Sequence, residues 1–311
     1  MDEFALIRRY FARLTAARAG VVLGVGDDAA LLAPQPGSQL VVTTDTLIAG
    51  RHFPEGTAPF DIGWKSLAVN LSDLAAMGAT PHWCLLALSL PDADARWLEY
   101  FSSGLRALAD HHCVALVGGD TTRGPLAITI TAIGEVPDGE ALLRSGARVG
   151  DLVCVTGTLG DAGLALALRP GLGDSFLMAR LNRPQPRVAA GIALRGIATA
   201  AIDLSDGLAG DLQHILDASG VGAVIHTDAL PASPSLARLA SDSSRLTYQL
   251  AGGDDYELCL CIPPERLDEV RARLDPPLSV IGRITAEPGL RFVDAAGATI
   301  TLETTAYRHF P

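Results

Sequence analysis

The apolar and polar residues of this chain follow two repeats, one typical of helices and one typical of strands. Apolar positions at helical spacing predict helices at 60–77, before Gly78, and at 93–110. Alternating or continuous apolar runs predict strands at 40–45, 83–90, 114–117, 128–136 and 152–156. Because helical and strand segments alternate, we expect an α/β or α+β fold.

A turn-rich segment at 137–151, PDGEALLRSGARVGD, interrupts this pattern. We therefore predict two domains, residues 1–139 and 140–311. In the second domain, the segment IDLSDGLAGDLQHIL predicts a helix that Ser205 caps and Gly220 ends.

The helix predicted at 60–77 carries polar residues in an apolar setting. Ser66, Asn70 and Asp73 are four and then three residues apart, so they share one face of the helix. A buried carboxylate is costly unless it is paired or holds a metal. On helical geometry alone, this polar stripe faces either a functional site or the backbone of a neighbouring segment.

Composition narrows the class of protein. With 49% hydrophobic and 19% charged residues, the 311-residue chain is globular. A net charge of −11 without a basic patch argues against nucleic-acid binding, and no run of 18 apolar residues predicts a membrane span. The N-terminus, MDEFALIRRYFARL, predicts an amphipathic helix and not a signal peptide. Five cysteines without a CxxC motif predict a reduced, cytoplasmic protein, with Cys259 and Cys261 as small hydrophobic residues on one strand face.

Acids recur beside Gly, Ser or Thr at the ends of predicted elements, and Asp45 and Asp120 are predicted at strand ends. Each segment alone is more typical of a turn or a helix cap. Together they supply hard oxygen ligands, which suit Mg²⁺ and not zinc. The match of GVGDDA to a dinucleotide-binding turn is poor, because Asp27 and Asp28 would place two charges against a pyrophosphate. The same acids are sensible if metal ions stand between them and a polyphosphate. The segments are GVGDDAAL, TTDT, NLSDLAA, GGDTT, IDLSDG and GGDDYE.

Longer stretches from residue 24 to about 260 resemble the thiamine-monophosphate kinases, members of the aminoimidazole-ribonucleotide-synthetase-like ATP-binding superfamily. The resemblance is carried, in order, by GVGDDAALL, VVTTDTLIAGRHF, KSLAVNLSDLAAMGA, VGGDTTRGPL, RSGARVGD, AIDLSDGL and GGDDYELC. It implies an N-terminal domain that binds ATP and Mg²⁺ and whose mixed sheet pairs across a homodimer. It also implies a C-terminal α/β domain that completes the active site.

The implied reaction is direct phosphoryl transfer from ATP to thiamine monophosphate, with several Mg²⁺ ions. Carried over by this resemblance, the catalytic residues are Asp45, Asp73, Asp120 and Asp206. The implied nucleotide contacts are Gly119, Asp120, Arg144 and Ser205, and the substrate contacts are His52, Glu257 and Tyr307. The implied metal ligands are Asp28, Thr43, Thr44, Asp45, Asp73, Asp120, Asp203 and Asp206.

Alternatives remain open at this stage. The chain could be another ATP-dependent synthetase of the superfamily, or a nucleotide-binding module without catalysis. His52 could be an ordinary loop residue, Glu257 a solvated strand residue and Tyr307 part of the core. Sequence does not decide between Asp27 and Asp28 as the ligand. His111 and His112 stand where the family's pattern leads us to expect an aromatic residue near the nucleotide, so the adenine contact is undefined.

Overall fold

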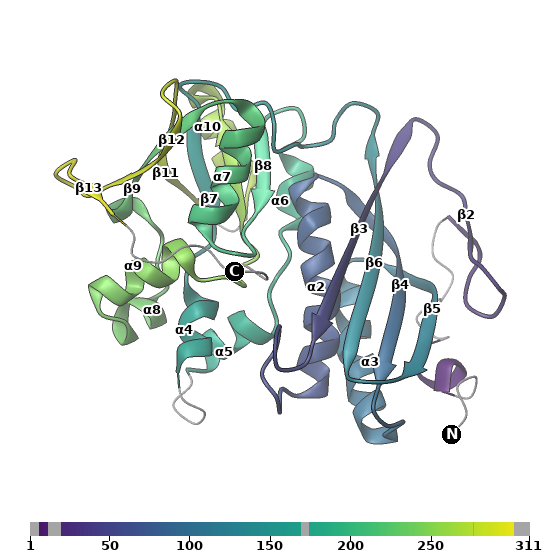
Figure 1. Cartoon of the computed structure of the whole chain (residues 1–311). Coiled ribbons are helices and arrows are strands. Elements are labelled where there is room, and N and C mark those ends of the chain that lie inside the picture. Colours follow the sequence, from purple (N-terminus) through teal and green to yellow (C-terminus); the bar gives the residue numbers. More distant parts are fainter. Residues whose placement is uncertain (1–5, 12–19, 169–173, 276, 302–311) are drawn as a thin grey trace. The chain divides into compact units, whose positions relative to one another are not determined.

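The computed structural model describes residues 6–11, 20–168, 174–275 and 277–301 (Figure 1). The chain divides into two compact units. The first comprises Met1–Leu74 and Ala79–Gly139, and the second comprises Ala75–Gly78 and Glu140–Pro311. Most of the predicted N-terminal helix lies outside the described residues; the described part contains a short helical segment, η1 (Ile7–Phe11). No helix in the described ranges is long and apolar enough to cross a membrane.

The first unit is built on a four-stranded sheet in the order β3-β6-β4-β5. The β4–β5 pair is parallel and the other two pairs are antiparallel, so the sheet is mixed. Its elements are β1 (Val21–Leu23), β2 (Leu31–Leu32), β3 (Ser38–Ile48), α2 (Pro59–Ala76), β4 (Thr80–Leu90), α3 (Ala95–His111), β5 (Ala115–Arg123) and β6 (Ala127–Pro137).

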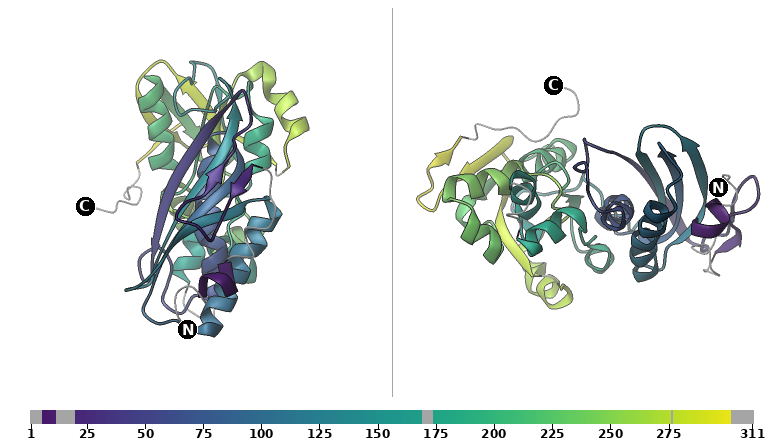
Figure 2. Two further views of the ribbon diagram at one scale, coloured as in Figure 1. Left: turned by 90° about the vertical axis from the view of Figure 1, so that its right-hand side faces the viewer. Right: turned by 90° about the horizontal axis from the view of Figure 1, so that it is seen from below.

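Helices α2 and α3 cover one face of this sheet, and the β1–β2 hairpin covers part of the other (Figure 2). Two glycines allow the helices to come close. A Cβ atom on Gly63 would lie 2.1 Å from the carbonyl oxygen of Phe101, and one on Gly104 would lie 1.9 Å from that of Phe60. Any larger residue at either position would push α2 and α3 apart.

The predicted strand ends at Asp45 and Asp120 are wrong. Strand β3 continues to Ile48, because its pairing with β6 runs without a break through Asp45. Strand β5 continues to Arg123, because Asp120 and the residues after it pair with β4. Both acids therefore lie within paired strands, and alternation along the strand decides which face each one occupies.

The second unit contains a seven-stranded mixed sheet in the order β13-β12-β9-β11-β7-β10-β8. The strands are β7 (Leu152–Thr156), β8 (Ala200–Asp203), β9 (Gly222–His226), β10 (Leu258–Ile262), β11 (Leu278–Thr285), β12 (Gly289–Val293) and β13 (Thr299–Ile300). The helices are α4 (Asp161–Ala167), α5 (Ser175–Asn182), α6 (Val188–Ala193), α7 (Leu208–Ser219), η3 (Thr227–Ala229), α8 (Pro234–Leu239), α9 (Asp242–Ala251), η4 (Pro264–Arg266) and α10 (Leu267–Arg273).

The main core of the second unit lies between this sheet and α7. Leu212 and Ile215 from α7 pack in one buried cluster with residues of β7, β8 and β10. Cys259 and Cys261 are fully buried in the same cluster, which confirms their prediction as small core residues. Their thiols, like those of the other three cysteines, are free. The two units together confirm the predicted α/β fold class with two folded bodies.

Candidate active site

The polar face of α2 meets the edge strand β3. The Asp73 carboxylate accepts a 2.5 Å hydrogen bond from the Thr43 hydroxyl. The amide oxygen of Asn70 accepts the backbone N–H of Asp45 at 3.1 Å, and Asn70 itself is fully buried. Asn70 Nδ2 in turn donates to the carbonyl of Ser66. The stripe therefore does contact backbone, through Asn70, and it also brings Asp73 and Thr43 together beside Asp45.

Two other predicted ligands of the first unit lie on the opposite face of the sheet. The Thr44 hydroxyl is paired with that of Thr131 at 2.6 Å, across strands β3 and β6. Asp120 pairs with Ala87 in the same side-chain row as Thr129 and Thr46. Strands β3 and β5 are the two edges of the sheet, three strand spacings or about 14 Å apart. One chain therefore does not bring Asp120 to Asp45 and Asp73.

The backbone of β5 requires a glycine at position 119, for a reason that the sequence does not reveal. The φ of Gly119 is +144°, and a Cβ atom there would lie 1.9 Å from the carbonyl oxygen of Leu86. The missing side chain is thus required by the close approach of β4. An approach of phosphate to the Gly119 backbone, as predicted for the nucleotide, is not needed to explain this glycine.

Asp27 and Asp28 are both exposed on the loop between β1 and β2. The Asp27 side chain accepts the backbone N–H of the next residue, Asp28, at 2.8 Å. Asp28, the ligand that the family resemblance implies, is exposed on this loop beside Asp27.

In the second unit, Asp203 ends strand β8 and is buried, and the loop Leu204–Gly207 leads into α7. The prediction that Ser205 caps α7 is wrong. The helix begins at Leu208, and Gly207, in the cap position, makes no side-chain cap bond. The predicted end at Gly220 is confirmed, with φ of +68°.

Asp211, which the sequence analysis missed, replaces the expected cap from inside the helix. Its Oδ2 accepts the backbone N–H groups of Ser205, Asp206 and Gly207 at 3.0, 3.1 and 3.1 Å. These amides therefore already hold a carboxylate, so they are not open to a phosphate as helix N-termini often are. Burial, and then the charge of Asp206, raise the pKa of Asp211 to about 7. The signal in the sequence was an acid in the first turn of the helix, which usually indicates only a favourable dipole contact.

Arg144 is exposed on the segment that follows β6, and its loop is tied to the other end of α7. The Ser219 hydroxyl donates to the carbonyl of Arg144 at 3.2 Å. The Ser219 hydroxyl oxygen also accepts the N–H groups of Gly146 and Ala147 at 3.2 and 3.1 Å. Ser219 was also missed, because a serine near a helix end has many ordinary uses.

His52 is half-buried after β3. Its Nδ1 accepts the backbone N–H of Ile48 at 3.0 Å, so in this arrangement a proton on the ring sits on Nε2. Its carbonyl accepts from the Lys65 ammonium at 3.4 Å. Tyr307, the third predicted substrate contact, lies outside the described residues.

Glu257 is fully buried, so its interpretation as a solvated strand residue is wrong. Its Oε1 accepts from Nη2 of Arg180 at 2.9 Å and from Nη2 of Arg187 at 2.5 Å. Its Oε2 accepts from Nε of Arg187 at 2.6 Å and from the Thr156 hydroxyl at 2.7 Å. We call these four residues the Glu257 cluster. Arg180 also contacts Asp161, with 3.7 Å between Nε and Oδ2.

The neighbouring Asp255 is buried as well. Both of its carboxylate oxygens accept the backbone N–H of Gly160, at 3.0 and 2.9 Å. Burial raises the pKa of Asp255 well above its ordinary value, although the Arg180 charge acts against this. The GGDDYE segment thus contains two inward-facing acids, each with defined partners.

The donor chemistry of the predicted ligands fits Mg²⁺. Among the described residues, no group of three or more His, Cys, Asp and Glu side chains lies close enough to hold a metal ion. Mg²⁺ sites in phosphate-transferring enzymes typically use one or two carboxylates and complete the shell with phosphate oxygens and water. Asp73 with Thr43, and Asp203 at the end of β8, offer carboxylate and hydroxyl oxygens, which are donors of the type that such sites use.

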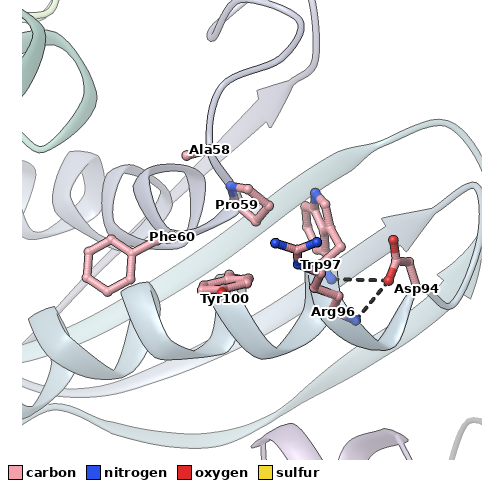
Figure 3. Close-up of a pocket in the computed structure, with 7 residues that line it drawn as sticks. All are labelled: Ala58, Pro59, Phe60, Asp94, Arg96, Trp97 and Tyr100. Carbon is pink, nitrogen blue, oxygen red and sulfur yellow. Dashed lines mark hydrogen bonds between the residues drawn. The ribbon is translucent and has the colours of Figure 1, made fainter.

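A separate pocket opens between the N-terminal ends of α2 and α3 (Figure 3). Phe60, Trp97 and Tyr100 contribute its aromatic walls, and the Arg96 guanidinium lies 5.9 Å from the centre of the Tyr100 ring. The Asp94 side chain at its rim caps α3 by accepting from the N–H groups of residues 96 and 97. The seven residues that line it include none of the predicted site residues.

The chain matches two family models. Residues 26–136 match the AIR synthase related protein N-terminal domain, and residues 148–295 match the corresponding C-terminal domain. The thiamine-monophosphate kinases of Escherichia coli and Salmonella typhimurium are each 48% identical to it over 319 residues, covering 99% of this chain and 98% of theirs. That of Bacillus subtilis is 36% identical over the full length of both chains.

Solved structures agree. Thiamine-monophosphate kinase from Stenotrophomonas maltophilia has a TM-score of 0.87 at 50% identity, covering 94% of this chain and 96% of that one. AaThiL complexed with AMPPCP and TMP has a TM-score of 0.78 at 31% identity, covering 99% and 97%. The hydrogenase maturation protein HypE from E. coli, at 22% identity and a TM-score of 0.79, shares the fold. By its length, identity and architecture, the chain belongs to the thiamine-monophosphate kinase family.

Proposed function

We propose that this chain transfers the γ-phosphoryl group of ATP to thiamine monophosphate, giving ADP and thiamine diphosphate, the last step of thiamine diphosphate biosynthesis. The observation that carries the proposal is the Thr43–Asp73 pair beside Asp45, on a helix and strand whose sequences match this family. Relatives at 48% identity carry the name of this activity, and AaThiL was solved with AMPPCP and TMP.

Phosphoryl transfer asks a protein mainly for alignment and charge neutralisation. Bound Mg²⁺ would supply charge neutralisation between the phosphates and the acids. The residues proposed to hold it are Asp28, Thr43, Thr44, Asp45, Asp73, Asp120, Asp203 and Asp206, and the Thr44 hydroxyl is also paired with that of Thr131. Gly119, Arg144 and Ser205 are proposed for ATP, and His52 and Tyr307 for the acceptor; Glu257, the third acceptor residue that the resemblance implies, is proposed to act on the acceptor indirectly, because its carboxylate is filled by donors of the chain. The acceptor phosphate is already ionised at neutral pH, so no strong general base is required.

The test is direct. The purified chain with Mg²⁺, ATP and thiamine monophosphate should form thiamine diphosphate, EDTA should stop the reaction, and added Mg²⁺ should restore it. Turnover of an amidine ribonucleotide in place of thiamine monophosphate would instead identify a ring-closing synthetase of the same superfamily. Nucleotide binding without turnover of either compound would identify a non-catalytic module.

We further infer that the chain works as a homodimer through the sheet of the first unit. Strand β3 is an edge, and Leu40 and Val42 on it are 51% and 59% exposed. An exposed apolar edge strand usually has a partner. A second copy would also explain the position of Asp120, which one chain keeps away from Asp45 and Asp73. The cytoplasmic location stays a prediction.

Mixing two inactive variants tests this arrangement. If Asp120 serves the partner's site, mixing Asp45→Asn with Asp120→Asn should give hybrid dimers with one intact site. A statistical mixture would then recover about one quarter of the wild-type activity. No recovery after verified subunit exchange would show that both acids serve the same chain's site.

A further inference from the structure

The Glu257 carboxylate has no acceptor position left for a substrate. An ionised carboxylate offers about four lone-pair sites, two on each oxygen. Four donors fill them: Arg180, Arg187 through two nitrogens, and the Thr156 hydroxyl. The side chain is fully buried. A hydrogen bond from a thiamine group to Glu257 would therefore require one of these donors to leave.

The backbone around Glu257 leads to the loop between Asp203 and Asp206. The carbonyl of Glu257 accepts the N–H of Leu204 at 2.8 Å, and the N–H of Tyr256 donates to the carbonyl of Leu204 at 2.8 Å. The N–H of Asp254 donates to the carbonyl of Ser205 at 2.9 Å. The residues between the two acids are thus held on one side by the segment 254–257.

This segment has a backbone that its residue types do not favour. Asp254 and Tyr256 have φ angles of +67° and +49°, in the left-handed region that costs a non-glycine residue energy. Such a conformation persists when surrounding contacts determine it. The flanking contacts here are those of the Glu257 cluster, the two bonds from Gly160 to Asp255, and the bond from the Tyr256 hydroxyl to Asp254.

We propose that Arg180 and Arg187 are positioning residues that hold Glu257, and through it segment 254–257, so that the Asp203–Asp206 loop is fixed for Mg²⁺ and the nucleotide. Glu257 is then itself a positioning residue, and its effect on the acceptor is indirect. This inference rests on the proposed function for the role of the loop, but the contacts that carry it do not depend on which acceptor is phosphorylated.

Variants of the donors test the proposal, with calorimetric binding of AMPPCP in the presence of Mg²⁺ as the main readout. Arg187→Met should weaken this binding by roughly 10- to 100-fold, as losses of outer-shell partners typically do. Thr156→Val, which removes a single donor, should shift it in the same direction by less. The KM for thiamine monophosphate should change by less than about threefold, because outer-shell contacts act on the loop and not on the acceptor. Arg238→Met is the matched control, since the Arg238 side chain is 63% exposed and pairs with Asp174 in the same unit, away from Glu257.

Combining Arg187→Met with Glu257→Gln distinguishes a positioning role of Glu257 from direct contact with the acceptor. In a positioning network, Arg187→Met and Glu257→Gln should be strongly non-additive in their effect on AMPPCP binding. The proposal is overturned if Glu257→Gln raises the KM for thiamine monophosphate while AMPPCP binding stays at the wild-type value. It is also overturned if Arg187→Met and Thr156→Val bind AMPPCP as tightly as wild type.

Two features keep the test decisive. If Glu257→Gln does not fold, Arg187→Lys and Thr156→Val still perturb the cluster with smaller changes, and thermal unfolding identifies the folded variants. If the wild-type chain does not phosphorylate thiamine monophosphate, the proposed function fails, but the AMPPCP arm needs no acceptor and still decides the positioning role.

Discussion

Two sets of acids, one in each unit, sit in largely apolar surroundings but differ in how they are held. Asp73 in the first unit is half-buried and accepts a hydrogen bond from the neutral Thr43 hydroxyl. On the same face of α2, the Asn70 amide oxygen accepts the backbone N–H of Asp45. Glu257 in the second unit is fully buried and accepts three of its four hydrogen bonds from guanidinium groups. The charge of Glu257 is therefore balanced by cations of the chain itself, whereas Asp73 is an acid that we propose to hold Mg²⁺. Burial of an acid is therefore a weak sign of catalysis until its partners are known.

The largest expected effect on the free energy of unfolding comes from removing the Glu257 carboxylate. Glu257→Ala leaves the partly buried guanidinium groups of Arg180 and Arg187 without this anion. Breaking one side of a buried ion pair typically costs about 3–5 kcal/mol of unfolding free energy. Urea denaturation followed by circular dichroism would measure it. Glu269→Ala, which breaks surface pairs with Arg266 and Arg273, is the control and should cost about 1 kcal/mol or less. Equal losses in the two variants would contradict the assigned difference.

Removing the Asp73 carboxylate should have the opposite result, with turnover lost and stability retained. Asp73→Asn should reduce turnover of thiamine monophosphate by at least about 100-fold, since even outer-shell losses reach that range. Its thermal unfolding temperature without Mg²⁺ should stay equal or rise, because one anionic charge near Asp45 is gone. Asp92→Asn, with an 85% exposed side chain, is the matched control. An unfolded Asp73→Asn protein would place Asp73 with Glu257 as a structural acid.

A smaller effect should come from the side chain that links Asp73's helix to β3. Asn70→Ala removes the amide oxygen that accepts the backbone N–H of the half-buried Asp45, and loss of such a hydrogen bond typically costs about 0.5–1.5 kcal/mol. The kcat should fall by a larger free-energy equivalent than the free energy of unfolding does, because Asp45 loses its fixed position. Gln213→Ala removes an exposed amide bonded to Asp217 and is the comparison. A stability loss with unchanged kcat would show that Asp45 does not depend on this contact.

The smallest expected effect concerns His112 and the pH dependence of the unfolding temperature. Burial, and then His111, lower the pKa of His112 to about 4 from an ordinary value near 6.5. The folded state favours the neutral ring, so this contribution to stability is present above pH 6.5 and is lost as pH falls toward 4. His112→Gln should therefore reduce the fall in unfolding temperature between pH 7 and pH 5 by about 2–4 °C. His226→Gln, an exposed ring, should leave that fall unchanged.

Sequence patterns predicted the elements with strong periodicity and missed the polar continuations. The helix predicted at 60–77 was observed at 59–76, and the strand at 152–156 was observed with the same bounds. Strands β3 and β5 were predicted too short, because TTDT and GGDTTR lack the apolar alternation that marks a strand. Their pairing with β6 and β4 extends them, and such pairing is not visible in a local pattern.

The site was predictable only in part for a similar reason. The face shared by Asn70 and Asp73 follows from helical spacing, and the structure does place it against β3. The partners of Glu257 are 70 and 77 residues away along the chain, so sequence spacing could not distinguish a buried pair from a solvated acid. Asp211 was overlooked because its role depends on how the loop before α7 turns back over the helix.

Helix α7 acts as a spacer of fixed length in the second unit. Asp211 near its start holds the loop of Ser205, and Ser219 at its end holds the loop of Arg144. Its twelve residues span about 18 Å, and each added residue would turn the far end by about 100°. Insertions or deletions inside this helix would therefore misalign two proposed nucleotide contacts at once, even where every side chain is kept. We expect natural and engineered length variation in this unit to avoid α7.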